Sequence, residues 1–279
     1  MLEQPIPIAR GNTQQMTKST KMPIVFFGHG SPTNALEDNI ATQSWKRIAD
    51  SIERPKAILC VSAHWYTHGT AVTAMETPRT IHDFGRTLPA PLFDCQYPAP
   101  GSPALAERVA ELLKPTAVQM DQSWGLDHGA WAVFSKAWPD ADIPIVELSV
   151  DMSRTEQWHY DIGKRLKPLR DEGILIAGSG DIVHNLSVMD GNEESPPYDW
   201  ATRFNDYIKN CIVEDNPQGV LDYQARGMDA TLSVPTKDHF LPLLYVLGAR
   251  EEDDKLQFVS DFIQYKSLSM TSIVLGEFA

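Results

Sequence analysis

Short apolar runs alternate along the chain with segments in which apolar residues recur every three or four positions. Such alternation is typical of an α/β fold, and the continuity of the apolar runs is typical of strands covered on both faces. We therefore expect one domain with a central, largely parallel or mixed sheet flanked by helices. The strand candidates are residues 23–27, 57–61, 143–150 and 174–177, with 268–275 as a further edge or central strand.

Local signals mark the ends of several expected helices. Ser102 precedes a proline and predicts an N-cap. Residues 153–156 match a capping box, and the apolar stripe of the helix that follows begins at Trp158, which places His159 on the solvent side. A short apolar helix over 240–248 is expected to end at Gly248, a natural C-cap.

The remaining segments set the domain limits. Residues 1–21 are polar and predict a loosely held N-terminal arm, which leaves 22–279 as the folded domain. A chain of 279 residues suits one large domain of this kind. The stretches 75–101 and 186–199 are rich in Pro, Gly, Asn and charged residues, and long loops inside a compact domain are often functional lids.

Charge and cysteine content argue against several classes of binding partner and site. The net charge of -13 disfavours nucleic acid and anionic membrane surfaces. No apolar run approaches the roughly 18 residues of a membrane span. Cys60, Cys95 and Cys211 have no short spacing, which argues against a disulfide framework and against a cysteine-based zinc site. A reducing, cytoplasmic location is therefore expected, and the oligomeric state stays open.

Three histidines follow expected strands. His29, His64 and His184 come directly, or within a few residues, after a buried strand. The carboxyl ends of parallel strands meet at one edge of a sheet, where ligands bind. Imidazole suits Fe, Zn, Cu and Ni as a ligand. One histidine in such a place is usually a structural hydrogen-bonding group, but three in equivalent places predict a metal site.

Other histidines leave alternatives open. His239 lies at the start of an expected helix and is either a cap or a ligand. His128 follows Asp127 and is either a positioned acid/base or a loop hydrogen-bonding group. His82 lies in the lid-like loop, where it could contact a substrate, whereas His68 is expected on the surface.

Many of these residues lie in segments that follow one another from about residue 22 to the end of the chain. The segments are Gly28-His29-Gly30-Ser31-Pro32, Ser62-Ala63-His64-Trp65, Thr80-Ile81-His82-Asp83-Phe84, Tyr97-Pro98-Ala99-Pro100-Gly101, Trp124-Gly125-Leu126-Asp127-His128-Gly129, Val183-His184-Asn185-Leu186 and Asp238-His239-Phe240-Leu241-Pro242-Leu243. Taken together, they resemble the 4,5-DOPA dioxygenase extradiol family, within the class III extradiol ring-cleavage dioxygenases. The resemblance covers residues 22–279 as one catalytic domain.

This resemblance implies a non-haem Fe(II) site that opens a catechol ring beside its two hydroxyls. By matching position, His29, His64 and His239 would be metal ligands. His184 would be a fourth ligand, an acid/base, or both at different steps. His128 would be a second polar group over the substrate. The implied partners are O2 and a small catechol such as L-DOPA, and the implied product is of the muconic semialdehyde type.

One departure from the wider superfamily bears on the metal. Related enzymes use two histidines and a glutamate, whereas His239 occupies the place of that carboxylate here. The exchange makes the site more cationic by one charge and more tolerant of zinc, so Zn(II) is a plausible bound metal beside catalytic Fe(II). Two alternatives stay open: a zinc-dependent hydrolase on a similar sheet, and a metal- or ligand-binding protein without catalytic power.

Overall fold

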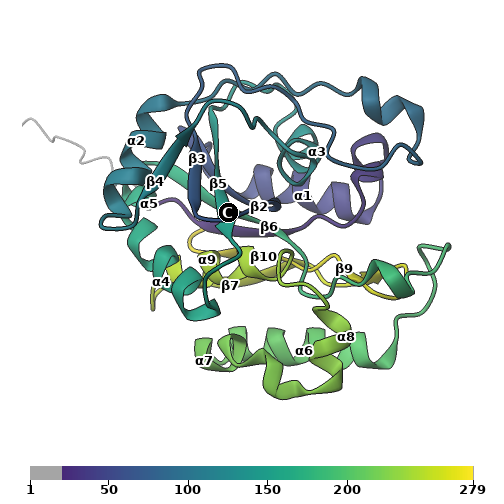
Figure 1. The fold of residues 1–279 in the computed structure, drawn as a ribbon. Helices are drawn as coiled ribbons and strands as arrows, with labels where there is room; N and C mark the ends of the chain where they lie inside the picture. Colours follow the sequence, from purple (N-terminus) through teal and green to yellow (C-terminus); the bar gives the residue numbers. More distant parts are fainter. Residues whose placement is uncertain (1–20, 279) are drawn as a thin grey trace, which may run out of the picture.

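The computed structural model describes residues 21–278, so the expected N-terminal arm lies outside the described residues except for Lys21. An eight-stranded mixed sheet forms the centre, with the strand order β4-β3-β5-β2-β6-β1-β10-β7 (Figure 1). Its strands are β1 Ile24–Gly28, β2 Ala57–Thr67, β3 Thr70–Thr73, β4 Val118–Asp121, β5 Ile145–Asp151, β6 Ile174–Gly180, β7 Leu256–Ser260 and β10 Ser272–Leu275. The short strands β8 Ile263–Gln264 and β9 Leu268–Ser269 pair separately.

The four strands at the centre of the sheet, β5, β2, β6 and β1, run parallel. They are four of the five strands that the apolar runs predict. β3 and β4 extend one side antiparallel to β5, while β10 and β7 extend the other. The expected α/β fold with a mixed central sheet is therefore confirmed.

Helices cover both faces of the sheet. They are α1 Ile40–Ser51, α2 Pro103–Leu112, α3 His128–Ala137, α4 Glu156–Leu166, α5 Pro168–Asp171, α6 Asp199–Val213, α7 Pro217–Leu221, α8 Met228–Ser233 and α9 Leu241–Ala249. Short 3-10 turns occur at η1 Pro32–Leu36, η2 Ala90–Asp94, η3 Leu186–Val188 and η4 Tyr223–Arg226.

The two faces of the sheet form two separate cores. In β1, Ile24 and Phe26 join the core under α2, α4 and α9, whereas Val25 and Phe27 join the core under α1 and α3. Successive side chains of a strand point to opposite faces, so a strand covered on both sides needs apolar residues throughout. Figure 1 shows α6, α7 and α8 as a further layer below α9 and β10.

The contact between α4 and α9 corrects the expectation for Gly248. This residue lies inside α9 and does not cap it. A Cβ at Gly248 would lie 2.1 Å from the Tyr160 carbonyl oxygen, and one at Gly163 would lie 2.3 Å from the Tyr245 carbonyl oxygen. Glycine at both positions therefore lets the two helix backbones touch.

The same contact overturns the expected orientation of His159. Its side chain is fully buried, and its Nδ1 lies 2.8 Å from the Tyr245 hydroxyl. The buried face of α4 consists of His159, Ile162, Gly163 and Leu166, and Trp158 is only half-buried. The expected capping box is also wrong, because Thr155 is the N-cap and accepts a hydrogen bond from the Trp158 N–H.

The apolar run 268–275 divides between two sheets. Its first residues form β9, and its last four form β10, which lies between β1 and β7. Gly28 allows the close approach of this segment, because a Cβ there would lie 2.6 Å from the backbone carbonyl carbon of Met270. The last described strand is therefore an inner strand of the sheet.

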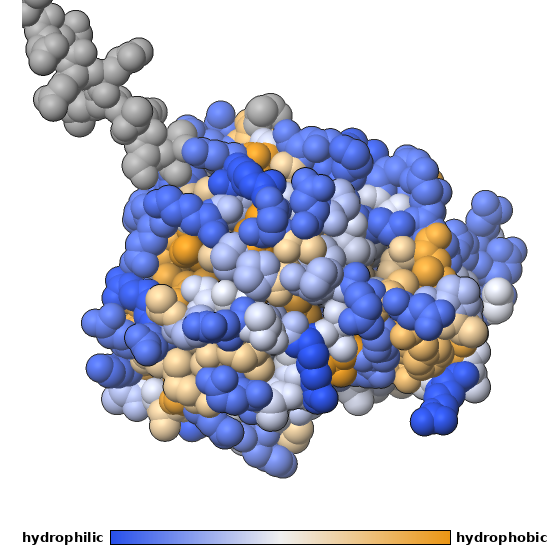
Figure 2. All heavy atoms as spheres, turned by 90° about the horizontal axis from the view of Figure 1, so that it is seen from above, coloured by the Kyte–Doolittle hydropathy of each residue, from blue (hydrophilic) through white to orange (hydrophobic). Residues whose placement is uncertain are grey.

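The face in Figure 2 is mostly hydrophilic, with apolar side chains in small separate areas, in keeping with the net charge of -13. No helix within residues 21–278 has the length and apolar character needed to cross a membrane.

Candidate active site

His29 is placed by a sharp turn directly after β1. Its backbone N–H donates to the Gly180 carbonyl at the end of β6. The next residue, Gly30, has a φ of 57°, and a Cβ there would lie 2.5 Å from the Met270 sulfur. Only glycine readily adopts this positive φ and leaves room for the Met270 sulfur. The turn that Gly30 allows holds the His29 imidazole at the carboxyl edge of the sheet.

His64 lies in β2 at an irregularity. The pairing of β2 with β5 shifts register between Val61 and Tyr66, and such a bulge re-aims side chains near active sites. Two residues earlier, the Ser62 hydroxyl accepts a hydrogen bond from the His64 N–H and donates one to Asp127. A Cβ at Gly129 would lie 3.0 Å from the His64 ring, so this glycine lets α3 begin close to the imidazole.

Two other histidines stand at the starts of helices. His128 is the first residue of α3, whose N-cap is Asp127. His239 precedes α9, and its carbonyl accepts a hydrogen bond from the Asp181 N–H just beyond β6. Gly180 allows this contact, because a Cβ there would lie 2.2 Å from the His239 oxygen. The helix starts are thus fixed against the strand ends.

Five of the eight histidines meet in one cluster. The ring centroids of His29, His64 and His239 lie 4.9 to 5.2 Å apart, and the Nε2 atoms of His29 and His64 are 3.0 Å apart. The His128 ring lies 3.7 Å from that of His64. The His184 ring stacks on that of His239 at 3.5 Å, with an angle of 4° between the planes.

Hydrogen bonds at Nδ1 determine which ring nitrogen is available. The Ser179 hydroxyl uses its only proton to donate to the Gly129 carbonyl, so the Nδ1–H of His29 must donate to Ser179. The Nδ1–H groups of His128 and His239 donate to Asp83 and Asp238. In the neutral form of each ring, Nε2 is then left with a lone pair, as metal-binding imidazoles require.

Burial keeps several of these imidazoles neutral. The pKa values of His29 and His64 lie well below the ordinary range because the rings are buried, and the neighbouring imidazoles lower them further. Burial, followed by the effect of His239, lowers the pKa of His184 to about 2. A neutral imidazole can bind a metal or accept a proton.

Three carboxylates belong to the cluster and were not expected from the sequence. Asp83 accepts from both the backbone N–H and the ring of His128, and its Oδ2 lies 3.4 Å from Nδ1 of His64. Burial raises the pKa of Asp83, but the hydrogen bond and charge of His128 outweigh burial and leave it lowered. The pKa of Asp238 is lowered in the same way, with the His239 hydrogen bond outweighing burial.

The third carboxylate, Asp181, follows β6 directly and is 1% exposed. Burial raises its pKa to about 7. A sequence signal for all three existed, because Asp83 follows His82, Asp238 precedes His239, and Asp181 lies three residues before His184.

His82 and His68 lie outside the cluster. The Nε2–H of His82 donates to the Cys95 carbonyl, and its ring packs against Phe84 and Trp131. Phe84 in turn lies 5.5 Å from the His128 ring, so one aromatic side chain links the lid loop to the cluster. His68 is exposed, as predicted.

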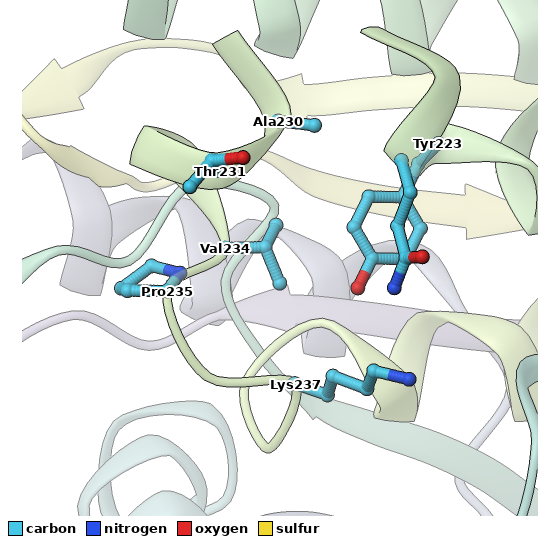
Figure 3. A pocket seen from close by; sticks show the side chains of 7 residues that line it. Tyr223, Ala230, Thr231, Val234, Pro235 and Lys237 are labelled. Atoms are coloured by element: carbon cyan, nitrogen blue, oxygen red, sulfur yellow. The ribbon is translucent and has the colours of Figure 1, made fainter. Parts of the chain in front are cut away.

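A pocket of about 300 Å³ borders the segment that leads to His239 (Figure 3). It is lined by η4, by α8 and by Lys237, two residues before His239. Lys237 is paired with Glu156 at 2.7 Å, so the charge of this pocket is already balanced.

The cluster meets the requirements of a metal site. Within residues 21–278, two sets of donor atoms lie within 4.8 Å of one another: those of His29, His64 and His128, and those of His29, Asp181 and His239. His184 belongs to neither set. The Oδ2 atom of Asp181 is buried without a hydrogen-bond partner, as expected of an atom whose natural partner is a cation. Imidazole and carboxylate together suit iron and zinc.

Comparison with known proteins assigns the chain to a family. Residues 18–276 match the catalytic LigB subunit of aromatic ring-opening dioxygenase. The chain belongs to this LigB family. It is 51% identical over 265 residues to a 4,5-DOPA dioxygenase extradiol of Escherichia coli K12, covering 92% of this chain and 96% of the relative. It is 35% identical to a protein of the same description from Beta vulgaris, covering 88% and 96%.

A solved structure supports the fold. The crystal structure of an uncharacterized protein from Escherichia coli K12 matches with a TM-score of 0.79 at 47% identity, covering 91% of this chain and all of that one. The expected extradiol ring-cleavage dioxygenase is therefore confirmed, and its family is metal-dependent. The hydrolase alternative gains no support from these relatives.

Proposed function

We propose that the chain is an Fe(II)-dependent extradiol dioxygenase that opens the ring of a catechol such as L-DOPA. The observation that carries this proposal is a cluster of imidazoles in which Nδ1 of His29, His128 and His239 is held by an acceptor, which leaves Nε2 as the atom that can bind a metal. The names of the two relatives support the substrate class. Both atoms of O2 enter the product, a muconic semialdehyde-type compound, so no further oxidant or reductant is needed.

His29, His64 and His239 would hold the metal. Their ring centroids lie 4.9 to 5.2 Å apart, and three protein ligands leave positions open for a chelating substrate. When bound, the ion supplies a binding site for the two catechol oxygens and lowers the pKa of the hydroxyls, as it does for bound water. Zn(II) fits the same donors and is a plausible resting occupant.

His184 is proposed as the first acid/base. Its ring stacks on that of His239, which places it beside the proposed ligands. Because burial keeps it neutral, it can accept a proton from a catechol hydroxyl and return it later in the reaction.

His128 is proposed as the second polar group over the substrate. Asp83 fixes its orientation through two hydrogen bonds, one to the backbone and one to the ring. Phe84 offers an aromatic face beside His128, and His82 supports Phe84 from the lid loop. We therefore propose that His82 contributes to substrate binding through this loop.

The setting of the reaction is proposed to be the cytoplasm. Cys60, Cys95 and Cys211 are all free thiols, which supports a reducing compartment. The partners are the catechol and O2.

The test is anaerobic loading of the protein with Fe(II), followed by addition of L-DOPA and air. We expect oxygen uptake and a yellow product, with zinc-loaded protein inactive in the same assay. Turnover of none among several catechols by the iron-loaded protein would overturn the proposal. Zinc-loaded protein that hydrolysed esters or amides instead would establish the hydrolase.

A further inference from the structure

We propose that Asp181 is an additional ligand of the metal centre in the substrate-free enzyme. This inference deepens the proposed function and rests on its metal site. The family resemblance implies that His239 stands where the wider superfamily has a carboxylate, and Asp181 would return a carboxylate to the site from a different element, the end of β6.

The geometry of the carboxylate carries the proposal. Oδ1 of Asp181 accepts a hydrogen bond from the Gly30 N–H at 3.2 Å, which fixes the side chain beside His29. Oδ2 lies 3.9 Å from Nε2 of His29. Two ligands bound to one ion at about 2.1 Å each can lie up to about 4.2 Å apart, so one ion can bridge this pair.

The surroundings of Oδ2 point to a cation. The atom is fully buried and has no hydrogen-bond partner, although the rest of the carboxylate is well held. Among residues 21–278, the ion-pair partner of Asp181 is His29, and no lysine or arginine is paired with it. The ionised form of a buried carboxyl group requires a compensating charge, and a metal ion held by His29 and His239 would supply it.

The charge of Asp181 has opposite consequences for the metal and for the substrate. A negative ligand strengthens binding of the cation, but it also reduces the positive charge available to a catechol that binds as an anion. Removal of the charge is therefore expected to weaken the metal site and to tighten catecholate binding. General damage to the site would weaken both.

The experiment compares Asp181→Asn with the parent protein in the zinc form, so that no turnover is needed. Asparagine keeps the acceptor for Gly30 and removes the charge. We expect zinc affinity, measured against a competing chelator, to fall roughly 10- to 100-fold. We expect 4-nitrocatechol, followed by its visible absorption, to bind the zinc-loaded variant at least several-fold more tightly. The cobalt(II) spectrum should also change.

Asp151→Asn is the matched control, because Asp151 is an equally buried carboxylate at the end of β5 and pairs with Arg154 outside the cluster. It should leave zinc affinity and the cobalt spectrum unchanged. If Asp181→Asn does not fold, Asp181→Ala is used with the same measurements. Unchanged zinc affinity together with an unchanged cobalt spectrum would overturn the role of Asp181. Failure of the parent protein to bind any metal would instead overturn the proposed function.

Discussion

Asp83 holds His128 at two points, through the backbone N–H at 2.9 Å and through Nδ1 of the ring at 2.8 Å. Oδ2 of Asp83, which accepts from the His128 ring, also lies 3.4 Å from Nδ1 of His64. One residue of the lid loop therefore contacts both the proposed second polar group over the substrate and a proposed metal ligand, so movement of the loop would alter the site directly.

Asp83→Asn is expected to lower kcat for ring opening roughly 10- to 100-fold, because outer partners of this kind orient the imidazoles. Steady-state oxygen uptake and circular dichroism would measure activity and fold. Asp94→Asn is the control, since Asp94 is an exposed carboxylate in the same loop. Full activity of the Asp83 variant would show that the hydrogen bonds are incidental.

His64→Ala is expected to abolish ring opening, with a loss of at least about 100-fold, and to reduce bound metal, because it removes a proposed ligand. The fold should stay nearly intact, because the side chain lies outside both cores. His68→Ala, four residues away and exposed, should retain nearly all activity. Oxygen uptake and metal analysis on both variants provide the comparison. An active His64→Ala protein would refute the ligand assignment.

His159 makes stability depend on pH. Burial lowers its pKa to about 4, whereas a histidine in the unfolded chain titrates near ~6.5. As the pH falls below about 6.5, the unfolded chain takes up a proton that the folded protein does not, so the free energy of unfolding decreases until about pH 4. Between pH 7 and pH 5 this one residue is expected to account for about 2 kcal/mol.

His159→Gln should therefore reduce the loss of stability between pH 7 and pH 5 by about 2 kcal/mol, as measured by urea unfolding at both values. His29, His64 and His184 act in the same direction, so the comparison with the parent isolates His159. An equal loss in parent and variant would show that His159 is not the titrating group.

Gly248→Ala is expected to destabilise the protein by about 1–3 kcal/mol, although alanine favours helices, because the new methyl group meets the Tyr160 carbonyl. Gly191→Ala serves as the control, since a Cβ there has nothing within 4 Å. Thermal or urea unfolding measures both. Equal stability of the two variants would mean that α4 and α9 can separate without cost.

The central strands and the meeting of His29, His64 and His184 at one edge of the sheet could be predicted from the sequence because both depend on local pattern, whereas His128 and His239 come from helix starts. An apolar run predicts a strand covered on both faces, and a histidine directly after such a strand lies at the carboxyl edge of the sheet. The short strand β4 could not be found in this way, since its residues are exposed or half-buried and form no apolar run.

The burial of His159 and the roles of the aspartates depend on contacts between distant segments. The buried face of α4 keeps Ile162 and Leu166 of the expected stripe but extends to His159 beside Gly163, the residue that lets α9 approach. The side chain of Asp181 is positioned by a hydrogen bond from the Gly30 N–H, some 150 residues earlier in the chain. No local sequence pattern records such a contact.

The insertion of β10 between β1 and β7 affects how the protein can be made. During synthesis, β1 appears long before β10, so its second edge stays open until residues 272–275 have left the ribosome. The turn that carries His29 packs against Met270 through Gly30, so it too waits for the late segment. A stalled or truncated product would therefore expose an unpaired strand edge and lack a finished catalytic centre.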